Sequence, residues 1–131
     1  MARKRVFISF DYDNDKALPG NLVAQAERSE SPFAFVDLSV KHSIDGRWQR
    51  EARKRIRNSD LVVVICGQHT HQAVGVEAEL SIARDEQKPY FLLRGRRDRA
   101  CKKPKNARRN DPIHPWKWTT LQKLFESAGR L

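Results

Sequence analysis

Cysteine is scarce in this chain, and long apolar runs are missing. Cys66 and Cys101 are the two cysteines among 131 residues. They are too few for a disulfide framework, and no Cys/His cluster has the spacing of a zinc site. No apolar run approaches the roughly 18 residues of a membrane span, and the apolar part of "MARKRVFISF" is too short for a signal peptide. We therefore expect a soluble, cytoplasmic protein of one domain, residues 1–131, with no bound metal.

Glycine-rich phosphate loops are also missing, in either of the two common spacings. Their absence argues against a P-loop kinase and against a Rossmann dehydrogenase. The carboxylates of "DYDND" (11–15) and Asp37 would suit a receiver domain that binds magnesium and accepts phosphate. A receiver needs an aspartate where the third strand ends, however, and this chain has Cys66 there. We therefore exclude a receiver, and we interpret Cys66 as a buried core thiol rather than a nucleophile.

Positive charge is plentiful and unevenly placed. The segment 94–109, "RGRRDRACKKPKNARR", contains nine Lys/Arg and one Asp, so it carries +8 of the net +10 and leaves +2 for the rest. Such a segment could attract nucleic acid or an acidic face of a partner protein. It has no interleaved aromatic residues for stacking on bases, which weakens the case for single-strand binding. We favour the simpler interpretation, a solvated and mobile basic loop of about 94–110.

Apolar runs of strand length alternate with amphipathic stretches along the chain. The sequence predicts strands at 5–10, 33–39, 60–67 and 89–95, and helices at 18–30, 45–59, 74–87 and about 116–128. The third strand, "DLVVVICG", is nearly all apolar, as expected of a central parallel strand that is covered on both faces. The alternation predicts right-handed βαβ units in a three-layer α/β domain. We expect a flavodoxin-like parallel sheet of four to five strands in the order 2-1-3-4(-5).

Sheets of this kind bind ligands beyond the carboxyl ends of their strands, at the switch point beside the first strand. That rule selects the loops "FDYDND", "DLSVKHSIDG" and "CGQHTHQAVG". Two acids, Glu77 and Glu79, follow the third of these loops on the predicted helix 74–87. A carboxylate near a helix N-terminus is often an ordinary stabilising residue. By residue chemistry alone we would interpret both glutamates in that way.

A set of motifs in a fixed order along the chain favours a functional role for one of these glutamates. The set is "RVFISFDYDND", "SDLVVVICGQHT", "GVEAELSIARDEQKPYFLL" and "HPWKW". Together they resemble the TIR-like domains of bacterial defence proteins, in particular the ThsB-type subunits of the Thoeris anti-phage system. The resemblance covers a core of about residues 3–95 well and the Trp-containing end more loosely. One departure is Gly75, which stands where many members of the family have tryptophan.

The resemblance implies an enzyme that cleaves the nicotinamide–ribose bond of NAD and cyclises ADP-ribose to a signalling nucleotide. In TIR enzymes a glutamate begins the motif Glu-(Ile/Leu)-x-x-Ala, and here the match at residues 79–83 assigns the catalytic role to Glu79. NAD is then a substrate, and no cofactor is needed. The residues implied to line the substrate pocket are Phe10, Asp11, Ser39, Ser43, Asp45, His69 and Thr70. Self-association through TIR surfaces and a phage-derived activator are the partners that the resemblance implies.

Each of these residues also has a simpler interpretation. Asp11, Asp45 and Thr70 are all suited to capping the helices that follow them, and Phe10 suits the core. Two other functions stay open at this point. The chain could be a TIR-like scaffold that assembles with partners and catalyses nothing, or it could bind polyanions through the basic loop. The first alternative predicts that Glu79→Gln leaves function intact, and the second predicts binding that weakens steeply with salt.

Overall fold

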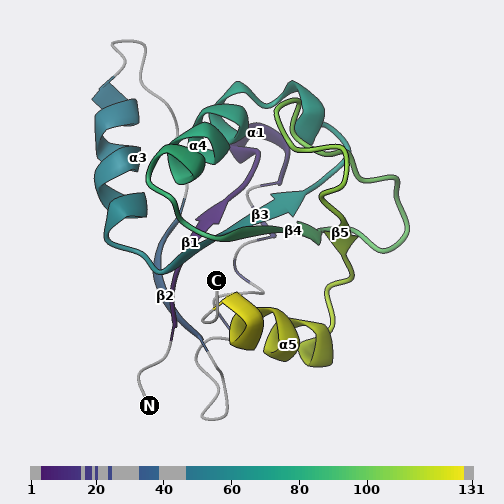
Figure 1. The fold of residues 1–131 in the computed structure, drawn as a ribbon. Helices are drawn as coiled ribbons and strands as arrows, with labels where there is room; N and C mark the ends of the chain where they lie inside the picture. The colour runs from purple at the N-terminus through teal and green to yellow at the C-terminus, as the bar shows by residue number, and fades with distance from the viewer. Residues whose placement is uncertain are drawn as a thin grey trace.

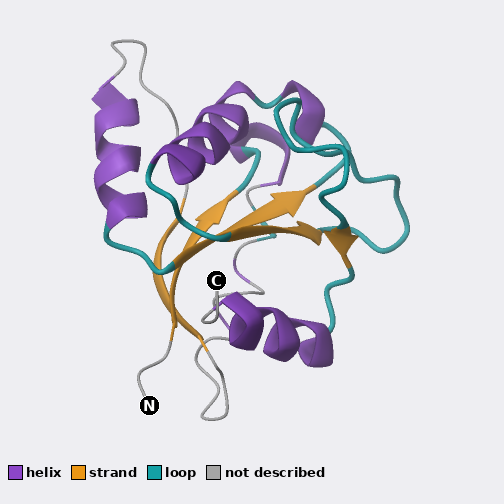
Figure 2. Cartoon of the chain, viewed as in Figure 1, coloured by secondary structure: helices purple, strands orange, loops and turns teal. Residues whose placement is uncertain are grey.

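The fold alternates strands and helices around one parallel sheet (Figures 1 and 2). A computed structural model describes residues 4–15, 17–18, 20, 24, 33–38 and 47–128. Its elements, in chain order, are β1 (Lys4–Ser9), α1 (Tyr12–Asp15), β2 (Phe33–Leu38), α3 (Arg47–Arg57), β3 (Leu61–Cys66), the 3-10 turn η1 (Thr70–Gln72), α4 (Val74–Asp85), β4 (Tyr90–Arg94), β5 (Ile113–His114) and α5 (Trp118–Ala128).

The sheet has the order β2-β1-β3-β4-β5, and all four pairings are parallel. This order confirms the predicted flavodoxin-like arrangement, including the short fifth strand. β3 lies in the centre and every one of its residues is buried, as its unbroken apolar sequence predicts. The observed strands lie within a residue or two of their predicted bounds. The predicted helix 18–30 lies outside the described residues except for Leu18, Gly20 and Ala24.

Two layers of apolar side chains cover the two faces of the sheet. Alternate residues of β1 and β3, such as Val6, Ile8 and Val63, pack with Leu121 of α5 on one face. On the other face, Phe7 and Val64 are among the strand residues that pack against α3 and α4. Figure 1 shows α5 on one side of the sheet and α3 and α4 together on the opposite side. The domain therefore has the three layers that the sequence predicts.

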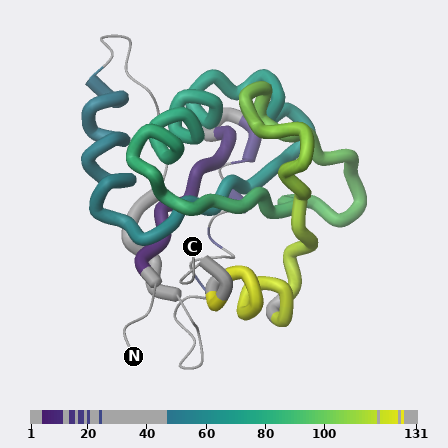
Figure 3. Tube along the Cα trace, in the orientation of Figure 1, coloured from purple at the N-terminus to yellow at the C-terminus, as the bar shows by residue number. Residues whose placement is uncertain are grey.

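The basic loop makes specific contacts with the rest of the domain. It leaves β4, crosses the N-terminal half of α4 and returns to β5, as the tube view shows (Figure 3). The Asn106 side chain donates to the Glu77 carbonyl at 2.7 Å, and the Lys102 N–H donates to the Gly67 carbonyl at 2.9 Å. Pro104, within the loop, is buried. These contacts join the loop backbone to β3 and α4, while most of its Lys and Arg residues are exposed.

Glu86, just after α4, links the two helices that cover one face of the sheet. Its carboxylate accepts hydrogen bonds from Arg57 at 2.6 Å and from Arg53 at 2.9 Å, both on α3. Hydrogen bonds from these guanidinium groups lower the pKa of Glu86 from about 4.5 to about 2. The negative charge of Glu86 is therefore favoured by folding, and it helps to hold α3 against α4.

We expect Glu86→Gln to change how stability depends on pH. A carboxyl group whose pKa is lower in the folded state stabilises the protein above its unfolded pKa, and this contribution disappears as pH falls through the folded value. The melting temperature of wild type should exceed that of Glu86→Gln above about pH 4.5, and the difference should shrink towards pH 2. Glu51→Gln, which removes an exposed pair with Arg55 at 3.8 Å, is the control. A difference that is independent of pH would contradict the assignment.

Candidate functional site

A hydrogen bond between two buried side chains marks the carboxyl end of β1. The Ser9 hydroxyl donates to Oε1 of Glu79 at 2.8 Å. Ser9 is fully buried, and Glu79 is 2% exposed. A carboxylate this deeply buried is stabilised by such hydrogen bonds, because water cannot solvate it. The pair therefore joins the first strand to α4 through a polar contact within a largely apolar layer.

The sequence of α4 explains why Glu79 points inward and Glu77 does not. Val76, Leu80 and Ala83 form the apolar stripe of the helix and are buried against the sheet. Glu79 follows Val76 by three residues, so it lies on the same face one turn later. Glu77 lies on the flank, half-buried beside the basic loop. Of the two acids, only Glu79 is turned towards the end of β1.

A second group of acids follows β1. Asp11 is 6% exposed and lies directly before α1, where its carbonyl accepts the Asp15 N–H at 2.8 Å. Its carboxylate accepts a hydrogen bond from the Asn14 side chain at 2.7 Å. Asp11 therefore occupies the capping position that its sequence context suggests. It also lies two residues after Ser9, on the same edge of the sheet.

Asp15 connects this group to the basic loop. It is 2% exposed, and its Oδ1 accepts a hydrogen bond from Arg96 at 3.2 Å. Its Oδ2 is buried with no hydrogen-bond partner. Burial raises the pKa of Asp15, and the Arg96 guanidinium opposes that effect. The carboxylate lies against Gly67, where β3 ends, and a Cβ added to Gly67 would overlap with it.

Thr70 stabilises the loop after β3 and does not cap α4. Thr70 is 1% exposed, and its Oγ1 accepts the Gly67 N–H at 2.7 Å. The N-cap of α4 is Ala73, which makes no side-chain capping bond. The interpretation of Thr70 as the cap of α4 was therefore wrong. Its hydroxyl instead closes the turn that directs the chain from β3 to η1.

The other predicted site residues lie in different places. Phe10 is 3% exposed and packs in the core on the α5 face, so its simpler interpretation fits the structure. His69 is exposed next to Thr70. Cys66 is fully buried, and burial raises the pKa of its thiol to about 12, which suits the predicted core residue. The remaining predicted positions, Ser39, Ser43 and Asp45, lie outside the described residues.

Ser9 is the residue that sequence reasoning missed. It is a small polar residue inside an otherwise apolar strand, "RVFISF". A buried polar residue in a strand needs a partner, so this position could have been singled out. Its partner could not be identified, because the contact joins residues 70 positions apart. Within the described ranges, no group of three or more His, Cys, Asp or Glu side chains could hold a metal ion.

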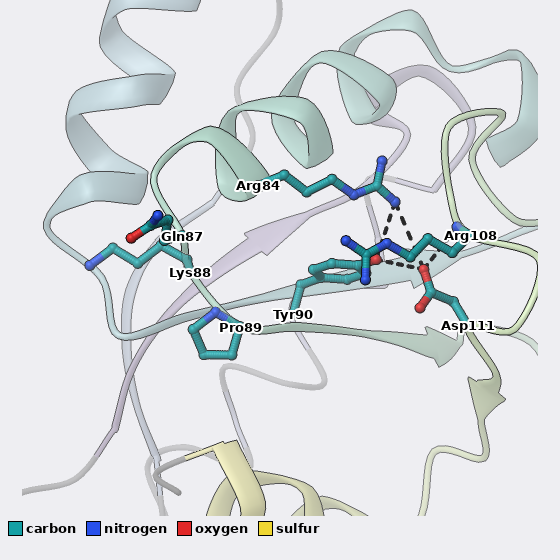
Figure 4. A pocket seen from close by; sticks show the side chains of 7 residues that line it. All are labelled: Arg84, Gln87, Lys88, Pro89, Tyr90, Arg108 and Asp111. Carbon is teal, nitrogen blue, oxygen red and sulfur yellow. Dashed lines mark hydrogen bonds and ion pairs between the residues drawn. The ribbon is translucent and has the colours of Figure 1, made fainter. Parts of the chain in front are cut away.

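A separate cavity of about 430 Å³ lies at the other end of α4, beside the start of β4 (Figure 4). There the Tyr90 hydroxyl donates to Oδ2 of Asp111 at 2.6 Å, and Arg84 donates to the Tyr90 oxygen at 3.1 Å. The Arg108 N–H also donates to Asp111, at 2.9 Å. These bonds fasten the far end of the basic loop to α4 and β4. We assign this network a structural role.

The comparisons with known proteins agree with this arrangement. The model of the family "Thoeris protein ThsB, TIR-like domain" matches residues 7–99, which is most of the chain. The chain belongs to this family. The match includes the end of β1 with Ser9, and all of α4 with Glu79. It confirms the resemblance on which the role of Glu79 was predicted, although the match itself assigns no role to any residue.

One solved structure similar to this ThsB-type chain is described as a prokaryotic SEFIR domain. It has 18% sequence identity and a TM-score of 0.54, and the alignment covers 97% of this chain and 96% of that one. At this identity the similarity establishes the fold alone. A comparison with curated proteins gives no match. No helix in the described part of the chain is long and apolar enough to cross a membrane.

Proposed function

We propose that this TIR-like protein cleaves the nicotinamide–ribose bond of NAD in anti-phage defence and closes the resulting ADP-ribose into a cyclic signalling nucleotide. The observation that carries the proposal is the buried pair of Ser9 and Glu79 at the carboxyl end of β1. It lies where open α/β sheets bind their ligands. Membership of the ThsB family supports a defence role and a TIR-type reaction.

Glu79 has the chemistry that such a cleavage needs. When the bond between the ribose carbon and nicotinamide breaks, the electron pair leaves with nicotinamide and the ribose becomes oxocarbenium-like. A fixed carboxylate stabilises this positive charge most strongly where water is excluded. The Ser9 hydrogen bond holds one carboxylate oxygen in place and leaves the charge on the side chain. Attack by a nucleophile within ADP-ribose then closes the ring, whereas attack by water yields linear ADP-ribose.

The burial of Glu79 bears on regulation. Because the carboxylate is 2% exposed, a dinucleotide must displace neighbouring groups to reach it. We therefore propose that the resting protein turns over NAD slowly. Self-association or a phage-derived activator would then stabilise an arrangement in which the site is open. No redox cofactor or metal takes part in the proposed reaction.

The test compares lysates of phage-infected cells that express wild type, Glu79→Gln or Glu77→Gln. NAD and all ADP-ribose species are quantified by mass spectrometry. The proposal expects a new cyclic ADP-ribose species, with loss of NAD, in wild type and Glu77→Gln but not in Glu79→Gln. If several phages produce no nucleotide difference between wild type and Glu79→Gln, the enzyme is refuted and the alternative of a non-catalytic assembly scaffold takes its place.

Ser9→Ala tests the positioning role of the hydroxyl. Loss of the 2.8 Å bond leaves the Glu79 carboxylate buried with one fewer donor, and we expect kcat to fall by about 10-fold to 100-fold, equivalent to about 1.5–3 kcal/mol for a bond to a charged group. KM for NAD should change less than kcat, because Ser9 orients the carboxylate rather than the substrate. Ser9→Thr, which keeps the hydroxyl, should recover part of the rate. Equal losses in the two variants would argue for a packing effect instead.

A further inference from the structure

A second cavity, of about 280 Å³, lies near the carboxyl end of β4. It is lined by Arg94, Arg97, Pro115, Trp116 and Lys117. Arg94 ends β4, Arg97 belongs to the basic loop, and the other three residues connect β5 to α5. In Figure 1 this connection runs down from β5 to the start of α5, on the opposite side of the sheet from α4. The cavity therefore lies at the β4–β5 edge of the sheet, and none of its described lining residues belongs to α4 or to the Ser9–Glu79 pair.

The described residues that line this cavity carry positive charge without a counter-charge. Three of the five lining residues are cations and none is an acid. Arg94 donates to the Arg99 carbonyl at 2.8 Å, a contact that does not neutralise its charge. Within the part of the chain that the structure describes, none of these three cations forms an ion pair. Like charges that gather without a counter-charge repel one another, and a bound anion would remove that cost.

Two other arginines close to this cavity or to the basic loop, Arg96 and Arg84, do form ion pairs with described carboxylates. Arg96 contacts Asp15 at 3.2 Å, and Arg84 lies 3.9 Å from Asp111. Each of these two arginines has a folded-state partner that explains its position. The cavity beside β4 has no such internal explanation among the described residues, which favours a ligand.

The backbone next to the cavity adds to the positive potential. Lys117 directly precedes α5, and its carbonyl accepts the Leu121 N–H at 2.9 Å, so it holds the N-cap position. A lysine side chain has donors only and cannot cap a helix. The first turn of α5 contains no acidic residue. The positive end of the helix dipole is therefore directed at a cavity that is already cationic.

Trp116 supplies an aromatic wall. It is half-buried and packs against the core cluster on the α5 face, so the core fixes its position while it also lines the cavity. Aromatic side chains stack on nucleobases with a preference worth about 1–3 kcal/mol per base. Cations near the phosphates and an aromatic ring near the base are the two elements of nucleotide recognition. The volume is close to the lower end of the roughly 300–1,000 Å³ range of small-molecule sites, so it suits a mononucleotide.

We propose that this cavity binds a nucleoside phosphate, with the phosphates held by Arg94, Arg97 and Lys117 and the base stacked on Trp116. The site is separate from Glu79 and does not depend on the proposed reaction. ADP is the appropriate probe, since it carries a purine and two phosphates and is not cleaved by the proposed chemistry. Inorganic phosphate tests the cationic part of the site alone.

The experiment measures binding of ADP and of inorganic phosphate by isothermal titration calorimetry at one fixed ionic strength. We expect ADP to bind at least about tenfold more tightly than phosphate. Arg97→Gln/Lys117→Gln should weaken ADP binding by at least about tenfold, since two charged contacts are lost. Lys105→Gln/Arg109→Gln removes the same charge from exposed positions of the basic loop that line neither cavity, and should leave ADP binding within about twofold of wild type.

Two further variants, both at Trp116, separate stacking from charge. Trp116→Leu should reduce the preference for ADP over phosphate, and Trp116→Phe should keep most of it, which distinguishes stacking from a loss of folding. Equal affinity for ADP and phosphate, or equal effects of the two double variants, would overturn the proposal. So would a protein that binds single-stranded DNA but does not bind ADP.

Discussion

Glu79→Gln should lower kcat for cleavage of the nicotinamide–ribose bond by about 10³-fold or more in protein that has been activated. Loss of one preorganised group that stabilises transition-state charge costs about 10²–10³ in rate, and here the lost group carries a full negative charge. The glutamine is nearly isosteric and can still accept the Ser9 hydrogen bond. The substitution therefore removes the charge and leaves the geometry of the α4–β1 contact in place.

Two measurements show whether a loss of kcat in Glu79→Gln comes from the missing charge and not from unfolding. The melting temperature of Glu79→Gln should equal or exceed that of wild type, because a neutral amide is less costly to bury than a carboxylate. Glu77→Gln should leave kcat and melting temperature close to wild type, because its half-buried side chain lies on the flank of α4. A Glu79→Gln protein that retains a tenth or more of the wild-type kcat would show that this carboxylate is not the catalytic group.

The fold could be predicted from the sequence because its signals are local. The run 61–66 is apolar without interruption and becomes the central strand, and the spacing of Val76, Leu80 and Ala83 becomes the buried face of α4. The order of the strands follows from general rules on parallel connections. The same local spacing also places Glu79 on the inward face. The family resemblance was needed to regard that position as functional.

The contacts that shape the site could not be predicted in the same way. Ser9 and Glu79 are 70 residues apart, and Arg96 and Asp15 are 81 apart, so no local pattern relates them. The charged composition of the basic loop predicts a solvated segment. Its hydrogen bonds to β3 and α4 run through the uncharged Asn106 and through backbone groups, which composition does not reveal. Long-range hydrogen bonds of this kind depend on register, and register is known only from the structure.

Gly67→Ala should destabilise the domain by about 1–3 kcal/mol, the usual cost of forcing an extra carbon into a packed site. The added Cβ would overlap with the Asp15 carboxylate and would lie 2.6 Å from its Cγ. Asp15 cannot move aside freely, because it is 2% exposed and bonded to Arg96. Gly20→Ala is the control, since no atom lies within 4 Å of its added Cβ, and its stability should not fall.

Adding Asp15→Ala should restore part of the stability that Gly67→Ala loses. This double-mutant cycle tests whether the clash with Asp15 causes the loss. Asp15 has one buried oxygen without a partner, and burial raises its pKa, so removing the carboxylate alone should cost less than the clash does. Arg96 is about one-third exposed and can then turn to solvent. The double variant should therefore be more stable in chemical denaturation than Gly67→Ala, with a coupling of about 0.5–3 kcal/mol. Additive losses would mean that Gly67 is required for another reason, such as the turn closed by Thr70.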